Sequence, residues 1–222
     1  MLYAFLAKLL MSGKLKFEQG KITFTKEPMT FFPLDTLKEM TTDAMKQGRH
    51  GIQQLYFYGW HFGYTFTYNY MKTLELKKFE ETFKLIMEVA SLIGYGDYQT
   101  LEFRRKIYSK FKNIENPFGL LFYPSKDKVC HFVRGMNAGG GAALHGILMN
   151  GIELECTAIN KKFCLFMNVN NAILQDKFKE ITREQLDLNW LKPRQLALIK
   201  SFGESEKEYL NYPKDYKLTS TA

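Results

Sequence analysis

Apolar and polar residues alternate along residues 15–25, which predicts a β-hairpin near the start of the chain. The alternation continues on both sides of Gln19 and Gly20, a pair that suits a tight turn. The apolar run of residues 1–11 that precedes it is too short to span a bilayer and lacks the features of a signal peptide. We therefore expect a docking helix at residues 1–13 and a cytoplasmic protein without a membrane span.

Two stretches repeat their apolar residues at the spacing of an amphipathic helix. In residues 33–47 the pattern places Leu37, Met40 and Met45 inward, and a glycine follows at the end. Residues 77–93 have apolar residues three and four apart and are also followed by glycine. Both stretches are therefore predicted to be helices with one buried face.

Two further stretches predict helices in close contact with neighbouring elements. Residues 52–71 are rich in aromatic residues, and on a helix Gly59 and Gly63 would share a face that lets another backbone approach. Residues 129–149 are rich in glycine and alanine. We expect the first to be a central buried helix and the second to pack tightly against a neighbour.

The remaining patterns predict strands, followed by short helices. Residues 101–111 alternate as a single strand would, and residues 152–159 and 163–169 are expected to pair as a second hairpin. The more polar C-terminal region has candidate short helices at residues 180–191 and 193–202. This order of elements predicts an α+β fold with an antiparallel sheet packed against helices.

Composition limits the number of domains and the kinds of partner. A chain of 222 residues, 45% of them hydrophobic, suits one domain with an appendage, and we expect a ligand-binding domain at residues 14–170 and a polar extension at residues 171–222. The net charge of +8 would suit nucleic acid if the basic residues formed one patch. Because they are interleaved with Asp and Glu along the chain, we expect a solvated surface and no direct nucleic-acid binding.

A group of cysteines and acidic residues forms a candidate metal site. Thiolates and a carboxylate are ligands that zinc prefers in a closed tetrahedral site, and three cysteines cannot all form disulfides. The candidate ligands are Cys130, Glu153, Cys156 and Cys164. Glu155 and His131 are rival ligands, and burial of the cysteines without a metal is the competing interpretation. Because Glu153 and Cys156 would point to opposite faces of a regular strand, this set requires a bulge or a strand end.

The segments around these positions resemble the 4-vinyl reductase domain family. The likeness lies in VCHFVRG at residues 129–135, GIELEC at 151–156 and FCLF at 163–166, in the spacing of the four candidate ligands, and in the aromatic segment LYFYGWHFG at 55–63. That family includes the aromatic-sensing domains of phenol- and toluene-responsive transcription activators. By wider resemblance its fold is shared with subunits of the TRAPP vesicle-tethering complex, which bury acyl chains.

This resemblance implies a sensor of a small hydrophobic or aromatic molecule with a structural zinc ion. The family's sensors hold zinc at the four positions named above, which favours Glu153 over Glu155 as the carboxylate ligand. The resemblance also implies a homodimer that passes its signal to a signalling or transcription partner protein.

A ligand of this kind requires an apolar cavity with a few polar groups, which the aromatic helix can supply. The side chains that we select for this cavity are Trp60, His61, Tyr64, Tyr68 and Phe122. The competing interpretation is that these aromatic residues belong to the core.

Catalytic motifs are absent from the sequence. It contains no nucleophile elbow, phosphate-binding loop or His-Glu-x-x-His motif, and four protein ligands leave a zinc ion no open position. We therefore expect a binding domain and not an enzyme. Two alternatives remain open: a TRAPP-like scaffold or lipid-binding interaction protein, and an enzyme that acts on a tetrapyrrole vinyl group or an aromatic compound.

Overall fold

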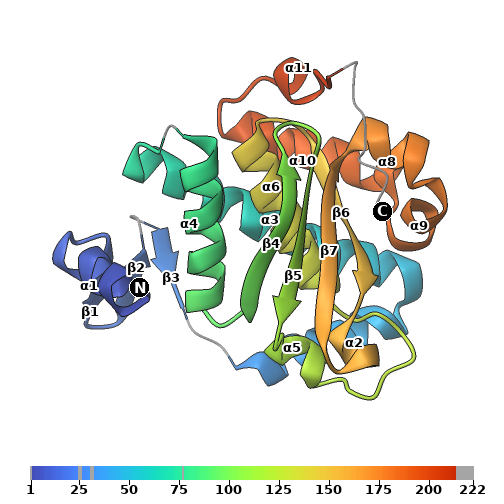
Figure 1. Cartoon of the computed structure of the whole chain (residues 1–222), viewed down its shortest axis with the longest axis horizontal. Helices are drawn as coiled ribbons and strands as arrows, with labels where there is room; N and C mark the ends of the chain where they lie inside the picture. The colour runs from blue at the N-terminus through green and yellow to red at the C-terminus, as the bar shows by residue number, and fades with distance from the viewer. Residues whose placement is uncertain (1, 25–26, 31–32, 77, 214–222) are drawn as a thin grey trace.

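The computed structural model describes residues 2–24, 27–30, 33–76 and 78–213 of the chain. Its centre is an antiparallel four-stranded sheet with the strand order β4-β5-β7-β6, with helices α3 and α6 behind it in Figure 1. The strands are β4 (Asp97–Arg104), β5 (Tyr108–Ile114), β6 (Met149–Glu155) and β7 (Phe163–Asn170). This arrangement confirms the predicted α+β fold.

The two central helices, α3 (Gly48–Leu74) and α6 (His131–His145), cross at unusually close range. A side chain at Gly63 would overlap the carbonyl oxygen of Met136, and one at Gly139 would overlap that of Trp60. Glycine therefore allows the two backbones to touch. The sequence predicted a close neighbour for each of these helices, but it did not predict that they pack against each other.

Helices α2 (Leu34–Lys46) and α4 (Phe79–Leu92) confirm the two amphipathic patterns. Leu37 is buried and Met45 is partly buried, as expected, but Met40 is 43% exposed, so its predicted inward position is wrong. The buried positions of α2 are Leu37, Thr41 and Ala44, so the buried stripe passes through Thr41 and leaves Met40 at its edge.

The N-terminal segment lies beside α4 in Figure 1. It consists of α1 (Leu2–Met11) and the strands β1 (Leu15–Glu18), β2 (Lys21–Phe24) and β3 (Glu27–Met29). The pairing of β1 with β2 confirms the predicted hairpin. Phe24 stacks on Phe66 and Tyr70 of α3 at centroid distances of 5.3 and 5.7 Å, and Leu9 is buried in the same cluster. The segment is thus attached through apolar contacts.

Two strand predictions were wrong at points where the chain turns. Residues 101–111 are not one strand, because β4 ends at Arg104 and a turn with Lys106 at φ 63° leads into β5. The strand expected at residues 152–159 ends at Glu155, and α7 (Thr157–Asn160) follows. Alternation of apolar residues continues through a tight turn, so it did not reveal either break. The pairing of β6 with β7 confirms the second hairpin.

Short helices complete the fold around the sheet: α5 (Pro117–Leu120), α8 (Asn171–Lys177), α9 (Lys179–Gln185), α10 (Leu188–Ser201) and α11 (Glu206–Tyr209). The boundary between two helices that was expected before Pro193 is wrong, because α10 begins after Asp187 and continues through Pro193. The Asp187 side chain caps α10 by accepting a hydrogen bond from the Trp190 N–H. Ile173, Leu191 and other residues of these helices share one core cluster with α3 and the sheet. The described part of the C-terminal region therefore packs into the main core.

Side chains cover the free edge of β6. The N–H of Gly151 donates to the Tyr56 hydroxyl at 2.8 Å, and Trp60 Nε1 donates to the carbonyl of Met149 at 3.0 Å. Gln185 pairs with both backbone groups of Glu153, at 2.9 and 2.8 Å. These bonds satisfy an edge that would otherwise be open to pairing with another chain.

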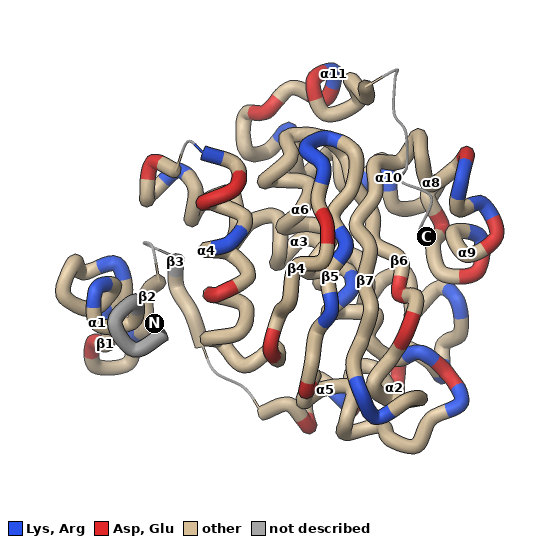
Figure 2. Tube along the Cα trace, viewed as in Figure 1, with Lys and Arg blue, Asp and Glu red and all other residues tan. Residues whose placement is uncertain are grey.

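The charge distribution and the helix lengths complete the description of the fold. Figure 2 shows basic and acidic residues interleaved over the described trace. Within that same part of the chain, no helix combines the length and apolar character needed to cross a bilayer.

Candidate functional site

The four candidate metal ligands come together beneath the sheet at one end of α6. Cys130 immediately precedes α6, Glu153 lies on β6, and Cys164 lies on β7. Cys156 follows β6 as the N-cap residue of α7. The ligand atoms of all four side chains lie within 4.8 Å of one another, and all four residues are buried.

A β-bulge makes this grouping possible. Glu153 is paired with Phe166 and Glu155 with Leu165, so the extra residue Leu154 shifts the register between them. Without the bulge, Glu153 and Cys156 would point to opposite faces of the sheet. The sequence predicted that such an irregularity was needed, and the structure contains it.

The sulfur spacing fits a tetrahedral metal site. Cys130 Sγ lies 3.8 Å from Cys156 Sγ and 3.6 Å from Cys164 Sγ. Zinc–sulfur bonds of about 2.3 Å at tetrahedral angles would place the sulfurs about 3.8 Å apart, whereas a disulfide requires about 2.05 Å. Both carboxylate oxygens of Glu153 are buried without a hydrogen-bond partner, which is costly for a carboxylate that does not bind a cation. The four residues therefore fit a zinc ion.

Donors around the cluster favour thiolates. Asn116 Nδ2 lies 3.6 Å from Cys130 Sγ and 3.4 Å from Cys164 Sγ, and the Thr157 N–H donates to Cys164 at 3.2 Å. Hydrogen bonds from Cys130 and Cys156, together with that N–H, lower the pKa of Cys164 to about 5. Outer donors of this kind orient ligands and balance their charge.

The other members of the cluster resist ionisation unless a cation is present. The hydrogen bonds with the two other cysteines raise the pKa of Cys130 well above its ordinary value, and burial adds to the effect. Burial raises the pKa of Glu153 well above its ordinary value, and the nearby Cys156 charge raises it further. A bound dication would offset both effects, because it favours the charged form of each ligand.

Arg134 is the buried cation beside the cluster. Its guanidinium lies over the Tyr56 ring at 4.8 Å and donates to the Gln185 side chain at 2.7 Å and to the Gln185 carbonyl at 3.1 Å. Burial lowers the pKa of Arg134, and the charges of Tyr56 and Glu153 oppose that shift. The exposed Lys161 and Lys162, although close in sequence, are less suited to balance a buried charge.

The rival ligands lie elsewhere. Glu155 is exposed and accepts a hydrogen bond from Asn160 Nδ2 at 3.2 Å. His131 is buried on the first turn of α6. It is not part of the cluster of candidate metal ligands found among the described residues. The geometry therefore favours Glu153 as the carboxylate of the set.

The five aromatic residues selected from the sequence do not surround one cavity. Trp60 and Tyr64 are fully buried in the core, where Tyr64 donates to the Tyr209 hydroxyl at 2.9 Å. His61 is exposed, and Phe122 packs on Phe118 near the metal cluster. Tyr68 lines a separate surface cleft. Four of these residues lie on the same aromatic helix, and Phe122 does not. A common helix therefore did not imply a common cavity.

An apolar cavity that the sequence did not reveal lies between α3, α4 and α6. Its free volume is about 40 Å³, which is room for no more than a few water molecules. The polar side chains at its wall are Thr67, Asn137 and Asn168. Asn137 Nδ2 and Asn168 Oδ1 are both buried without a hydrogen-bond partner. The apolar lining includes Phe62, Phe66, Phe83, Ile86, Met87, Ala90, Met136 and Leu144.

Two sequence features mark this cavity in hindsight. Asn137 lies on a helix composed mainly of small residues, and Asn168 alternates with apolar residues on the buried face of β7. Gly140 and Gly141 also line the cavity, and because they have no side chains they leave space between α6 and its neighbours. Polar residues within an apolar pattern were the available signal, although their meeting depends on the tertiary structure.

Comparisons with known proteins identify the fold. No family model matches the chain, and no curated protein matches it by sequence. Among solved structures, the phenol-responsive sensory domain of the transcription activator PoxR with phenol matches with a TM-score of 0.68 and 16% identity over 80% of this chain and 95% of that one. The sequence resemblance to that class of sensor domain thus has a counterpart in the fold.

Two further structures are similar. A subunit 3 of the trafficking protein particle complex from Naegleria fowleri, covalently bound to palmitic acid, has a TM-score of 0.50 and 13% identity over 61% of this chain and 91% of that one. A vinyl-4-reductase family protein from Methanocaldococcus jannaschii has a TM-score of 0.43 and 21% identity over 65% of this chain and 84% of that one. The similarities to the PoxR domain and to the trafficking subunit support the fold that the sequence resemblance implied, and identities this low establish the fold alone.

Proposed function

We propose that this chain is a non-enzymatic sensing domain that binds a small hydrophobic or aromatic molecule and is braced by a structural zinc ion. The observation that carries this proposal is the apolar cavity, with Asn137 and Asn168 at its wall, each of which has one buried amide atom without a partner. Buried polar atoms without partners are uncommon, and a ligand with one polar group in an apolar body would satisfy them.

The similarity to the PoxR sensory domain supports a ligand of this class, because that domain was solved with phenol. The cavity is smaller than an aromatic ring, so binding requires side chains to move. Met87 and Met136 line it, and methionine side chains change rotamer easily. Ligand entry would thus be coupled to a local rearrangement beside α6.

Zinc would be held by the three cysteines and Glu153. Four protein ligands form a closed site, so the ion would link the start of α6 to the β6–β7 hairpin and would not activate water. The three free buried thiols suit a reducing compartment, which supports a cytoplasmic location. Helix α6 begins at this site and lines the cavity, so it is the element through which ligand binding would reach a second copy of the chain or a partner protein.

A scaffold that holds an acyl chain is the second candidate function. It is favoured by the fold similarity to the trafficking subunit that carries palmitic acid. An acyl chain needs a long channel, whereas the cavity here is short and has two amide groups at its wall. These features favour a small molecule over an acyl chain.

Native mass spectrometry of the untagged protein tests the metal, the ligand and the oligomeric state together. We expect one zinc ion per chain and saturable binding of a small aromatic compound from a panel that includes phenol. Asn137→Leu should weaken this binding by about tenfold, whereas Asn211→Leu at an exposed site should not. Zinc-free protein, or a panel that gives no saturable binding, would refute the corresponding part of the proposal. Retention of a fatty acid instead would support the scaffold.

A further inference from the structure

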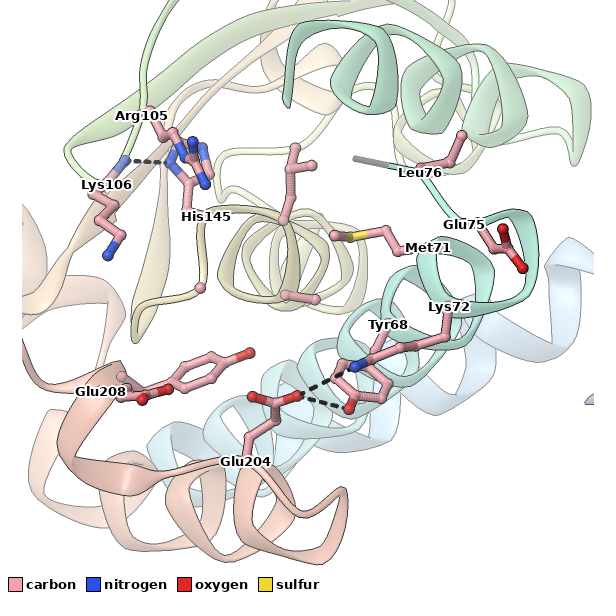
Figure 3. Close-up of a pocket in the computed structure, with 14 residues that line it drawn as sticks. Tyr68, Met71, Lys72, Glu75, Leu76, Arg105, Lys106, His145, Glu204 and Glu208 are labelled. Carbon is pink, nitrogen blue, oxygen red and sulfur yellow. Dashed lines mark hydrogen bonds and ion pairs between the residues drawn. The ribbon is translucent and has the colours of Figure 1, made fainter. Parts of the chain in front are cut away.

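A large cleft lies at the opposite end of α6 from the metal cluster. Its volume is about 710 Å³, which is within the range of small-molecule sites. The C-terminal ends of α3 and α6, the turn between β4 and β5, and the region around α11 line it, as Figure 3 shows. Of the residues that line the apolar cavity, only Leu144 also lines this cleft, so the two spaces are separate.

One wall of the cleft presents hydrogen-bond donors and positive charge. Arg105 and Lys106 project from the β4–β5 turn next to His145 (Figure 3). His145 Nδ1 accepts the N–H of Lys106 at 2.8 Å, so its proton is on Nε2. That Nε2–H is buried without a partner, and His145 as a whole is 1% exposed. His145 thus holds the β4–β5 turn in place through the Lys106 N–H, while Arg105 and Lys106 provide the charge of this wall.

The opposite wall presents carboxylates. Glu204 and Glu208 come from the region around α11, across the cleft from the β4–β5 turn in Figure 3. Glu204 accepts from the Tyr68 hydroxyl at 2.7 Å and lies 3.9 Å from Lys72 Nζ. The C-terminal end of α3 adds partial negative charge through its last carbonyl groups. This wall is therefore suited to a cationic group.

We propose that this cleft binds a zwitterionic small molecule. Its anionic group would contact Arg105 and Lys106, and its ammonium group would contact Glu204 and Glu208. Met71 and Leu144 provide apolar surface between the walls for a short aliphatic spacer. This site is independent of the proposed hydrophobic sensor site, because a ligand of either class could bind without the other.

Isothermal titration of the full chain with ε-aminocaproate, caproate and hexylamine tests the proposal. The three probes share an aliphatic chain and differ only in which charged groups they carry. We expect the zwitterion to bind at least about tenfold more tightly than either singly charged probe, because only it engages both walls. Absence of saturable binding by ε-aminocaproate, or equal affinity for caproate, would overturn the proposal.

Variants of each wall separate specific binding from general charge effects. Arg105→Ala and Glu208→Gln should each weaken ε-aminocaproate binding by about tenfold. The matched controls are Arg183→Ala and Glu206→Gln, which remove the same charges at positions outside the cleft. All four residues are on the surface or partly exposed, so the variants should fold. Equal loss in Glu206→Gln and Glu208→Gln would contradict a site at this place.

Discussion

Glu153 and Glu155 are two positions apart on one strand but lie in opposite environments. Glu153 is fully buried among the cysteines with both carboxylate oxygens unpaired, whereas Glu155 is exposed and bonds to Asn160. The bulge at Leu154 separates them. The chemical identity of the two residues is the same, so their roles depend on local backbone geometry alone.

We expect Glu153→Gln to lose zinc and Glu155→Gln to retain it. An amide is a poorer zinc ligand than a carboxylate, and loss of a ligand should lower zinc affinity by more than the roughly 10–100-fold typical of outer contacts. Competition with a chromophoric chelator measures the affinity, and thermal unfolding should show a lower Tm for Glu153→Gln only. Equal zinc binding by both variants would remove Glu153 from the ligand set.

Arg134 should matter for the same site through its charge. Arg134→Met keeps much of the buried volume but removes the cation beside Glu153, so we expect a loss of about 3–5 kcal/mol in the free energy of unfolding. Lys162→Met removes an exposed cation and should change stability by less than about 0.5 kcal/mol. Urea unfolding of the zinc-loaded proteins measures both, and similar stabilities would argue against a role for Arg134 as the balancing charge.

At the scale of elements, helix α6 connects the three candidate sites. Helix α6 begins directly after Cys130, lines the apolar cavity at Gly140 and ends at His145 in the charged cleft. The sequence predicted both helices and indicated that their glycines allow close packing. It did not show which glycines touch a backbone, because that depends on the crossing angle and the helix register.

Two adjacent glycines on α6 allow a direct test of the crossing. Gly139→Ala would force its new methyl group onto the Trp60 carbonyl, so we expect destabilisation at or above the roughly 1–3 kcal/mol of an overpacked core. Gly140→Ala would meet the Thr67 hydroxyl at 3.0 Å, which the side chain can relieve by a small shift. Thermal unfolding should therefore show a much larger loss for Gly139→Ala, and equal losses would contradict the close backbone contact.

At the scale of the molecule, the helices of the C-terminal region complete the core. Gln185 joins α9 to β6 and to Arg134, and Gln53 of α3 donates to the carbonyl of Gln185 at 3.0 Å. The polar composition of this region suggested an extension. Apolar residues of these helices, among them Ile173, Leu191 and Ile199, are buried in the main core, so a polar average composition concealed their packing.

Burial of His145 should make the whole molecule sensitive to acid. Burial lowers its pKa from 6.5 to about 3, and the charge of Arg105 adds to this effect. Between these values the unfolded state binds one more proton, so stability is full above the unfolded pKa and falls as pH decreases towards 3.

Replacement of this histidine should reduce the acid sensitivity. His145→Leu should lower the slope of unfolding free energy against pH by about 1.4 kcal/mol per pH unit in that window, where the buried His131 still contributes. Asn211→Leu, at an exposed site without a titratable group, should leave the slope unchanged. Urea unfolding at a series of pH values measures this, and an unchanged slope in His145→Leu would show that the ring is not buried in its neutral form.

The sequence by itself determined the elements whose signal is local. Alternation predicted the two hairpins, helical spacing predicted α2 and α4, and aromatic or small-residue composition predicted α3 and α6. Residue chemistry indicated the candidate zinc ligands, with Glu155 and His131 as rivals, and the need for a bulge or a strand end. Each of these depends on neighbours a few positions apart or on the ligand preferences of one metal.

Only the tertiary structure decided which distant surfaces meet. It showed that Trp60 caps a strand edge, that Tyr68 lines a charged cleft, and that Asn137 and Asn168 share an apolar cavity. It also ended β4 at a turn and left Met40 exposed. The physical reason is that a cavity is formed by the packing of several elements, whose register and crossing geometry are set by the whole core and not by any one segment.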